Sequence, residues 1–286
     1  ELNHIWGKSA SRGLDDKPES LAQHTLSAIE RFGDIIRLRP NLPEMIDAPR
    51  LWNNLFWACF LHDFGKAAKG FQEMLHESKR YTHRHEVFSL AFLDWLGAPL
   101  SEDDKHWIAA AIVSHHKDAD EIQRLYSTIG DPDNEIIAER LAEIDDSTLG
   151  HLWDWLAEYP RLWIDELHIK DESIILPSLM PRDDAIDSIR TNGAANIRKW
   201  LNAYGRWIRK INKSDEKALI LGTIALRGSI VYSQHLASAH SGELPPSTLA
   251  GPEKLLERFQ LSKPYDHQPF RQNIQRLTHS TWHSAR

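Results

Sequence analysis

The sequence predicts an all-α protein, and three observations support this class. Apolar residues recur at helical spacing along most of the chain. Gly and Pro separate these stretches, and no run shows the convincing alternation of a strand. Hydrophobic residues make up 41% and charged residues 26% of the 286 residues, which is the balance of a globular protein able to bury a core without disulfides. We therefore expect a helical bundle.

The helices of the first 117 residues are the best defined. Ser20 and Gln23 are spaced as a capping box at the start of the first helix, whose apolar residues recur every three or four positions. Pro40 follows that helix, and Gly65 and Gly97 are expected to stop later ones. The helices expected in this part of the chain span residues 20–39, 49–64, 67–77, 82–96 and 101–117.

The second half of the chain has a looser pattern. Residues 127–184 are acidic and contain four prolines, which predicts short helices joined by loops. Two long helices are expected over 185–212 and 216–240, before a Pro- and Gly-rich linker at 241–252 and a short helical tail. We expect one domain over residues 1–240, with 119–184 as a variable acidic region resembling an insertion. Residues 241–286 are expected to be a linker and the truncated start of a further region.

Composition excludes several classes of protein. No apolar run is long enough to span a bilayer. The single cysteine, Cys59, excludes an internal disulfide and a thiolate zinc cluster, and it favours a reducing, cytoplasmic location. No GxxxxGK[ST] motif is present, so no ATPase activity is expected from this chain.

The charge is unevenly distributed. The net charge is -7, but residues 131–172 hold 13 acidic and three basic residues, so the rest of the chain carries +3. The net charge argues against a surface uniformly coated with positive charge for nucleic acid. Repulsion of DNA, steering towards a site and simple solvation all remain open for the acidic block.

Histidine is the most informative residue type. Seven of the 16 histidines lie between His62 and His116, and helical spacing places His85, His115 and His116 on or beside apolar stripes. A single inward histidine, such as His24, is usually a buried ring bonded to a carbonyl. Five of them beside an aspartate need partners to offset the cost of burial. A metal cluster provides such partners, because imidazole suits transition metals and a carboxylate can bridge two ions.

These residues carry a resemblance to a known family. The segments IWGKS, ESLAQHT, LHDFGKAAKGFQ, HRHEVFSL and IVSHHKD occur in an order and at spacings that resemble the HD superfamily of metal-dependent phosphohydrolases. More narrowly, they resemble the HD nuclease domain of the CRISPR-associated type I interference nuclease–helicase. The resemblance is strong over residues 5–118, weak over 119–215, and returns in GSIVYSQHLASA.

The resemblance implies an HD-domain bundle with a two-metal site between core helices. His24, His62 and Asp63 would hold one ion, and Asp63 would bridge to a second ion completed by His85, His115 and His116. The histidine-rich ligands favour Mn, Fe, Co or Ni over Mg. Lys66 would face the substrate phosphate and stabilise the charge of the transition state. The structural alternative for Lys66 is a solvated cation near a helix C-terminus.

One position departs from the family pattern. The family usually has a late aspartate where this chain has Gln234, in SQHLAS. Gln234 offers an extra ligand or a holder of water, but it brings no charge. The neighbouring His235 would point about 100° away on a helix and is not expected to replace it.

The resemblance also implies a substrate and partners. Family members degrade single-stranded DNA that an attached helicase supplies after a guide-RNA surveillance complex opens the target. Four basic residues lie roughly on one side of the predicted helix 185–212, where they could follow a phosphate backbone or contact the helicase: Arg198, Arg206, Arg209 and Lys213. The interleaved aromatics Trp200, Tyr204 and Trp207 are more simply explained as core. The segment KPYDHQ, residues 263–268, resembles the start of such a helicase, which would make this chain the nuclease part of a longer protein.

Two other functions remain open. An HD phosphohydrolase acting on a nucleotide or cyclic nucleotide would share the first histidine and the His-Asp pair. A degenerate HD module would bind DNA or a protein without chemistry, and only Gln234 favours it. Among nucleases, endonuclease and exonuclease action are both compatible with the sequence.

Overall fold

The computed structural model describes residues 2, 4–9, 17–116, 121–122, 131–167, 169 and 174–238. The chain divides into two compact units, Glu1–Pro246 and Ser247–Arg286. All described residues belong to the first unit. The predicted linker 241–252, the helical tail and the KPYDHQ segment lie outside the described residues. Within the described part, no helix is long and apolar enough to cross a membrane.

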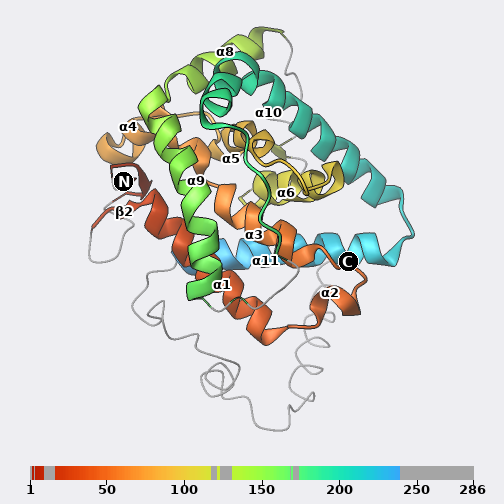
Figure 1. The fold of residues 1–286 in the computed structure, drawn as a ribbon. Helices are drawn as coiled ribbons and strands as arrows, with labels where there is room; N and C mark the ends of the chain where they lie inside the picture. The colour runs from red at the N-terminus through yellow and green to blue at the C-terminus, as the bar shows by residue number, and fades with distance from the viewer. Residues whose placement is uncertain are drawn as a thin grey trace, which may run out of the picture. The chain divides into compact units, whose positions relative to one another are not determined.

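The described structure is a helical bundle, which confirms the all-α prediction (Figure 1). A two-stranded antiparallel sheet, β1 (Trp6–Lys8) and β2 (Glu19–Ser20), precedes the helices and was not predicted. The α-helices are α1 (Leu21–Leu38), α2 (Leu42–Met45), α3 (Leu51–Leu61), α4 (Lys69–Glu77), α5 (His85–Ser89), α6 (Glu102–Ser114), α8 (Asp131–Ala142), α9 (Asp146–Glu166), α10 (Arg182–Lys213) and α11 (Lys217–Ser238). Two 3₁₀ segments, η3 (Phe64–Ala67) and η4 (Leu90–Trp95), follow α3 and α5.

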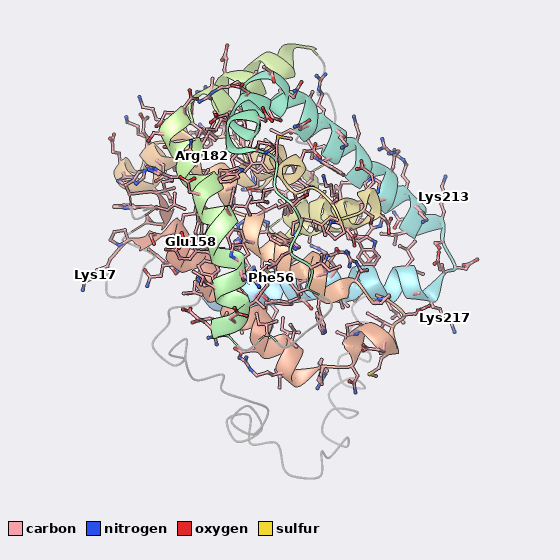
Figure 2. The ribbon with its side chains drawn as sticks, viewed as in Figure 1. Lys17, Phe56, Glu158, Arg182, Lys213 and Lys217 are labelled. Atoms are coloured by element: carbon pink, nitrogen blue, oxygen red, sulfur yellow. The ribbon has the colours of Figure 1, made fainter. Side chains whose placement is uncertain are left out.

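The central helix of the bundle is α3. All of its residues are buried, and the helix contacts α1, α6 and α11. Its sequence, LWNNLFWACFL, is apolar on nearly every face, as expected for a helix surrounded by other helices. Phe56 lies in this interior, whereas Lys213 and Lys217 lie at the periphery (Figure 2). The chain therefore leaves α3 inside the core, where the His62-Asp63 pair follows directly.

The helix α6 is fixed at its start by a capping box. Ser101 Oγ accepts a hydrogen bond from the Asp104 amide, and the Asp104 carboxylate accepts one from the Ser101 amide. Arg50, at the start of α3, donates to both oxygens of Asp104 at 3.0 and 2.9 Å. This bidentate pair ties the first turns of α3 and α6 together, and the two helices then run in contact towards the ends that carry His62 and His115.

Several predicted boundaries were wrong. The expected helix 82–96 begins only at His85, and it tightens into the 3₁₀ segment η4 after Ser89. The stretch 127–184 was expected to be short helices, but α9 continues for 21 residues through Pro160. A proline inside a helix loses a hydrogen bond and costs about 3 kcal/mol. Burial of Trp155, Pro160 and Trp163 in the core offsets that loss.

Gly65 lies where two backbone segments approach closely. It was expected to end the helix 49–64, but α3 ends at Leu61 and Gly65 lies in η3. A Cβ atom on Gly65 would lie 2.1 Å from the His85 carbonyl oxygen and 2.8 Å from the Ser89 amide. The absence of a side chain therefore lets the segment after His62-Asp63 pack directly on α5.

We expect Gly65→Ala to lower the free energy of unfolding by about 3 kcal/mol, because the new methyl group would push η3 away from α5. Gly228→Ala in α11 is the matched control, since a Cβ there meets nothing within 4 Å. That control should be neutral or stabilising by up to about 1 kcal/mol, from helix propensity. Urea unfolding of both variants measures the difference, and equal stabilities would contradict the close packing at Gly65.

Candidate metal centre

Four separate segments bring the six predicted ligands together. His24 lies in the first turn of α1, and His62 and Asp63 follow α3. His85 begins α5, while His115 and His116 follow α6. Their donor atoms form two groups, one of His24, His62 and Asp63 and one of His85, His115 and His116, each with all donor atoms within 4.8 Å of one another. All six residues are buried except His116, which is exposed.

The Asp63 carboxylate is the meeting point of these side chains. Its Oδ2 atom lies 3.1 Å from His62 Nε2 and 3.4 Å from His24 Nε2. Its Oδ1 atom lies 3.0 Å from His85 Nε2. One carboxylate oxygen therefore faces the first group, and the other faces a histidine of the second.

Helix ends fix the orientation of two imidazoles in the same way. His62 Nδ1 lies 2.7 Å from the Cys59 carbonyl oxygen, and His115 Nδ1 lies 2.5 Å from the Ile112 carbonyl oxygen. A carbonyl only accepts hydrogen bonds, so Nδ1 must carry the proton on both rings. In the neutral ring the lone pair is then on Nε2, the atom that faces the centre.

His24 is oriented by a carboxylate instead of a carbonyl. Its Nδ1 atom lies 3.2 Å from Glu19 Oε2 in β2, and both side chains are buried. This histidine–carboxylate pair is the usual support of a metal-binding imidazole, since it fixes the tautomer and increases the basicity of Nε2.

The atoms that face the centre lack hydrogen-bond partners. Within the described part of the chain, the buried Nε2 atoms of His24, His62, His85 and His115 make no hydrogen bond, and the contact of Asp63 with Lys66 is an ion pair. Buried polar atoms are rarely left in this state, and each one costs free energy. Nitrogen lone pairs around a carboxylate are a donor set suited to divalent transition metals, so these residues fit the metal that the resemblance implies.

The electrostatics favour the forms that bind metal. Burial alone would raise the pKa of Asp63, but His62 and Lys66 hold it well below its usual value, so the carboxylate is ionised. Burial, together with the charge of Lys66, lowers the pKa of His24. Burial and the neighbouring His116 lower the pKa of His115 further. Desolvation by the surrounding residues, together with the neighbouring His85, also lowers the pKa of His116, although the residue as a whole is exposed. The imidazoles of His24 and His115 are therefore neutral, with free lone pairs, at pH 7.

Lys66 lies inside the centre rather than in solvent. Its Nζ atom is 2.7 Å from Asp63 Oδ2 and donates to the Gly7 carbonyl at 2.8 Å. The ammonium group is buried, which excludes the simple explanation as a solvated cation. In this structure its contacts are to Asp63 and Gly7.

The structure adds residues that sequence reasoning missed. Gln72 donates to the carbonyls of Trp6 and Lys66 at 3.1 and 2.7 Å, and it accepts from the Trp6 amide at 2.9 Å. It thereby joins β1 to η3, the two segments that hold Lys66. Gly7 approaches α1 closely, because a Cβ there would lie 2.8 Å from His24 Cβ. The segments IWGKS and LHDFGKAAKGFQ contained both residues, but their contact requires the tertiary fold.

Ser89 forms hydrogen bonds with the backbone next to the candidate ligands. Its Oγ atom accepts a hydrogen bond from the Gly65 amide at 2.9 Å, and it lies 2.7 Å from the His62 carbonyl oxygen and 3.0 Å from that of His85. One hydroxyl therefore links the His62-Asp63 segment to α5. The sequence offered no signal for this role.

Gln234 occupies α11, which contacts α1 and α3. Its side chain is buried, and its Oε1 atom has no hydrogen-bond partner within the described residues. The adjacent His235 is exposed, as expected from the turn of the helix. A ligand or water-holding role for Gln234 stays a prediction.

The predicted basic stripe lies on α10. Arg206, Arg209 and Lys213 are exposed, and Arg198 is half-buried. The interleaved Trp200 and Tyr204 are buried in the core, whereas Trp207 is only half-buried. Contact of these cations with DNA or a helicase stays a prediction.

We expect the stability of the metal-free protein to fall as the pH drops below about 6.5. The unfolded chain takes up protons on His24 and His115 near that pH, whereas the folded chain does so only at lower pH. The free energy of unfolding should fall by up to about 1.4 kcal/mol per pH unit for each such histidine. The lowered pKa of Asp63 adds no slope here, because its contribution is lost only at more acidic pH.

Urea unfolding in EDTA between about pH 7.5 and 5.5 measures this slope. His115→Leu should reduce the slope, whereas the same change at the exposed His235 should not. A pH-independent stability across this range would contradict the burial of neutral imidazoles.

Comparison with known proteins agrees with this geometry. A search of curated proteins and a search of solved structures each found no match to the chain. The family model described as "Cas3, HD domain" matches residues 6–179, which is more than half of the chain and includes all six ligand positions. That family consists of metal-dependent nuclease domains of type I CRISPR systems, and the HD domain implies binding of divalent metal, with which the histidine–aspartate groups described above are compatible. This chain belongs to the Cas3 HD domain family.

Proposed function

We propose that this chain hydrolyses single-stranded DNA with two divalent transition-metal ions in type I CRISPR interference. One observation carries the two-metal proposal. The two oxygens of Asp63 face different ligand groups, Oδ2 towards His24 and His62 and Oδ1 towards His85. A carboxylate in that position is suited to bridge two ions about 3.5–4 Å apart, the spacing used for phosphodiester cleavage. The His-rich donors favour Mn, Fe, Co or Ni over Mg.

The residues of the chain prepare this site before any ion binds. When bound, such ions polarise a phosphodiester and lower the pKa of water, so that it becomes a nucleophile at neutral pH. The neutral imidazoles of His24 and His115 need lose no proton to bind. The backbone contacts of His62 and His115 hold their Nε2 atoms towards the centre, so little rotamer freedom is lost on binding.

Lys66 supplies the fixed positive charge of the site. Its contacts with Asp63 and Gly7 hold the ammonium beside the ligand carboxylate. From this position it would stabilise negative charge that develops on a substrate phosphate, because electrostatic interactions are strong in a buried site. The proposed role is therefore electrostatic and exerted from a preorganised position.

The substrate and partners follow from the family. Cas3-type nucleases of CRISPR systems act with a helicase. We extend this to single-stranded DNA delivered by a helicase, in cis or in trans, after a guide-RNA complex has opened the target. The exposed cations Arg206, Arg209 and Lys213 would follow the strand or contact the helicase. Hydrolysis of a nucleotide or cyclic nucleotide is the alternative, and the match to a nuclease family disfavours it.

We expect Asp63→Ala to abolish metal-dependent cleavage of labelled single-stranded DNA, because both ligand groups lose their shared carboxylate. The assay compares Mn²⁺, Ni²⁺ and EDTA, with duplex DNA and a panel of nucleotides as other substrates. Asp187→Ala, an exposed aspartate on α10, is the matched control and should cleave normally.

Cleavage by the Asp63 variant at the normal rate would reject the two-metal proposal. Hydrolysis of a nucleotide with no cleavage of DNA would favour the alternative. Folding of the variant is checked by circular dichroism, since removal of the carboxylate leaves the Lys66 ammonium buried without its partner.

We expect Glu19→Gln to weaken the binding of Mn²⁺ or Ni²⁺ about 10- to 100-fold, because Glu19 orients His24 and increases its basicity. Isothermal titration calorimetry of the metal-free protein measures the change. Glu44→Gln, at an exposed position in α2, is the matched control. An unchanged affinity in the Glu19 variant would show that His24 does not bind the ion.

A further inference from the structure

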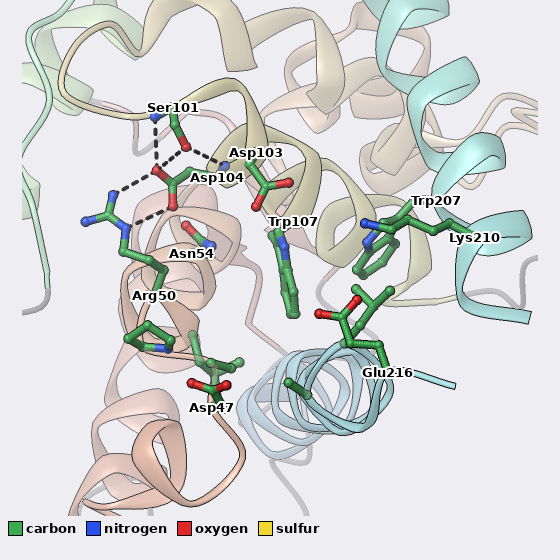
Figure 3. A pocket seen from close by; sticks show the side chains of 15 residues that line it. Asp47, Arg50, Asn54, Ser101, Asp103, Asp104, Trp107, Trp207, Lys210 and Glu216 are labelled. Carbon is green, nitrogen blue, oxygen red and sulfur yellow. Dashed lines mark hydrogen bonds and ion pairs between the residues drawn. The ribbon is translucent and has the colours of Figure 1, made fainter. Parts of the chain in front are cut away.

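A second site is suggested by a cavity on another part of the same compact unit. Its volume is about 360 Å³, within the range of ligand-binding pockets. It lies among the start of α3, the start of α6, the end of α10 and the start of α11 (Figure 3). None of the six metal ligands lines it.

Two tryptophans form the aromatic part of this cavity. Trp107 of α6 and Trp207 of α10 meet edge to face, with ring centroids 5.4 Å apart. Gly222 of α11 makes room for the Trp107 ring, because a Cβ there would lie 2.6 Å from its Cη2 atom. Both rings are half-buried, and no hydrogen bond joins either indole nitrogen to a described residue. The rings are therefore held in place while part of their surface stays open.

Unpaired acidic groups surround the two rings. Asp47, Asp103 and Glu216 line the cavity, are exposed, and form no ion pair with any described residue. In the view of Figure 3, Asp103 lies above Trp107, and Glu216 lies to its lower right. Lys210 is the one unpaired cation among the described lining residues, since Arg50 is held by Asp104. The free charge around the tryptophans is thus predominantly negative.

We propose that this cavity binds an arginine side chain of a protein partner. A guanidinium group stacks on an indole face and donates to carboxylates in its own plane, which matches the groups present here. The long aliphatic part of arginine suits the apolar walls formed by Ala48, Leu51 and Leu219. The cavity is large enough for one such side chain and is walled by residues of four helices.

A nucleic acid is the competing ligand, because α10 also carries the basic stripe. A base could stack on Trp207 with Lys210 contacting a phosphate. Three unpaired carboxylates against one unpaired ammonium would repel that phosphate, whereas they would attract a guanidinium. The predominantly negative charge of the cavity therefore favours a guanidinium ligand over a phosphate.

The test is a titration of the full chain labelled with ¹⁵N, observing the indole N–H signals of its tryptophans. Trp107→Phe and Trp207→Phe assign the two signals. The probes are the blocked peptide Gly-Arg-Gly, the same peptide with neutral citrulline in place of arginine, putrescine, and a thymidine pentanucleotide. We expect the arginine peptide to shift both signals and the citrulline peptide to leave them unchanged.

Two sets of variants make the outcome decisive. The double variant Asp103→Asn, Glu216→Gln should bind the arginine peptide about tenfold more weakly, or weaker still, because it loses charge-assisted hydrogen bonds. Lys210→Ala should tighten arginine binding, because it removes a like charge, whereas it would weaken binding of a phosphate. Thermal melting confirms that each variant is folded.

Four results would overturn the proposal. They are shifts of equal size with the citrulline peptide, stronger binding of putrescine than of the arginine peptide, shifts with the oligonucleotide alone, and no shift with any probe up to its solubility limit. The Asp63→Ala variant should bind the arginine peptide normally, so this result is independent of the nuclease activity.

Discussion

The buried carboxylate of Asp63 is the interaction on which the centre depends. It has no exposed surface, and an isolated charge in that position would cost several kcal/mol. Lys66 and three imidazoles surround it, which holds it in the ionised form. The same contacts tie α1, η3 and α5 to the end of α3. The arrangement proposed to bind metal is therefore also one that the core requires in order to contain this charge.

The ends of two neighbouring helices orient the donor atoms. The final carbonyls of an α-helix have no partner within the helix. In α3 and α6 one such carbonyl accepts a hydrogen bond from the histidine that follows three residues later, His62 or His115. Each contact satisfies a backbone group and also fixes a tautomer. The helices α3 and α6 are in contact, and Arg50 and Asp104 join their first turns. The two histidines at their other ends therefore lie close together in the centre.

The meeting of the six candidate ligands could be predicted from the sequence because their chemistry is local and their order is distinctive. A His-Asp pair after an apolar helix and a His-His pair after another mark their own positions. The supporting residues could not be predicted in this way. Gln72 and Gly7 act across β1 and η3, and Glu19 acts from a short strand that shows no alternation. Their roles depend on tertiary contacts between segments far apart in the chain.

Tertiary contacts also explain why some predicted helix boundaries were wrong. Pro160 is a strong local signal for a break, yet α9 continues because Trp155 and Trp163 pack into the core on either side of it. Local propensity is worth a few kcal/mol, and the burial of two tryptophans is of the same order. By contrast, the presence of α3 was predicted, although not its exact end, because nearly every residue in it is apolar, so local and tertiary preferences agree.

The number of buried acids in the core offers a physical reason for a neutral side chain at Gln234. Three buried acids, Asp63, Glu19 and Glu86, lie in or beside the ligand groups; Lys66 contacts Asp63, and Arg84 contacts Glu86. A carboxylate at position 234 would add a fourth buried acid to the core, and its charge would be poorly compensated until an ion was bound. The neutral amide avoids the cost of burying that charge, at the expense of attraction for a cation. On the two-metal proposal, folding would depend less on metal than with an acid at position 234, and affinity for ions would rest on the imidazoles and on Asp63.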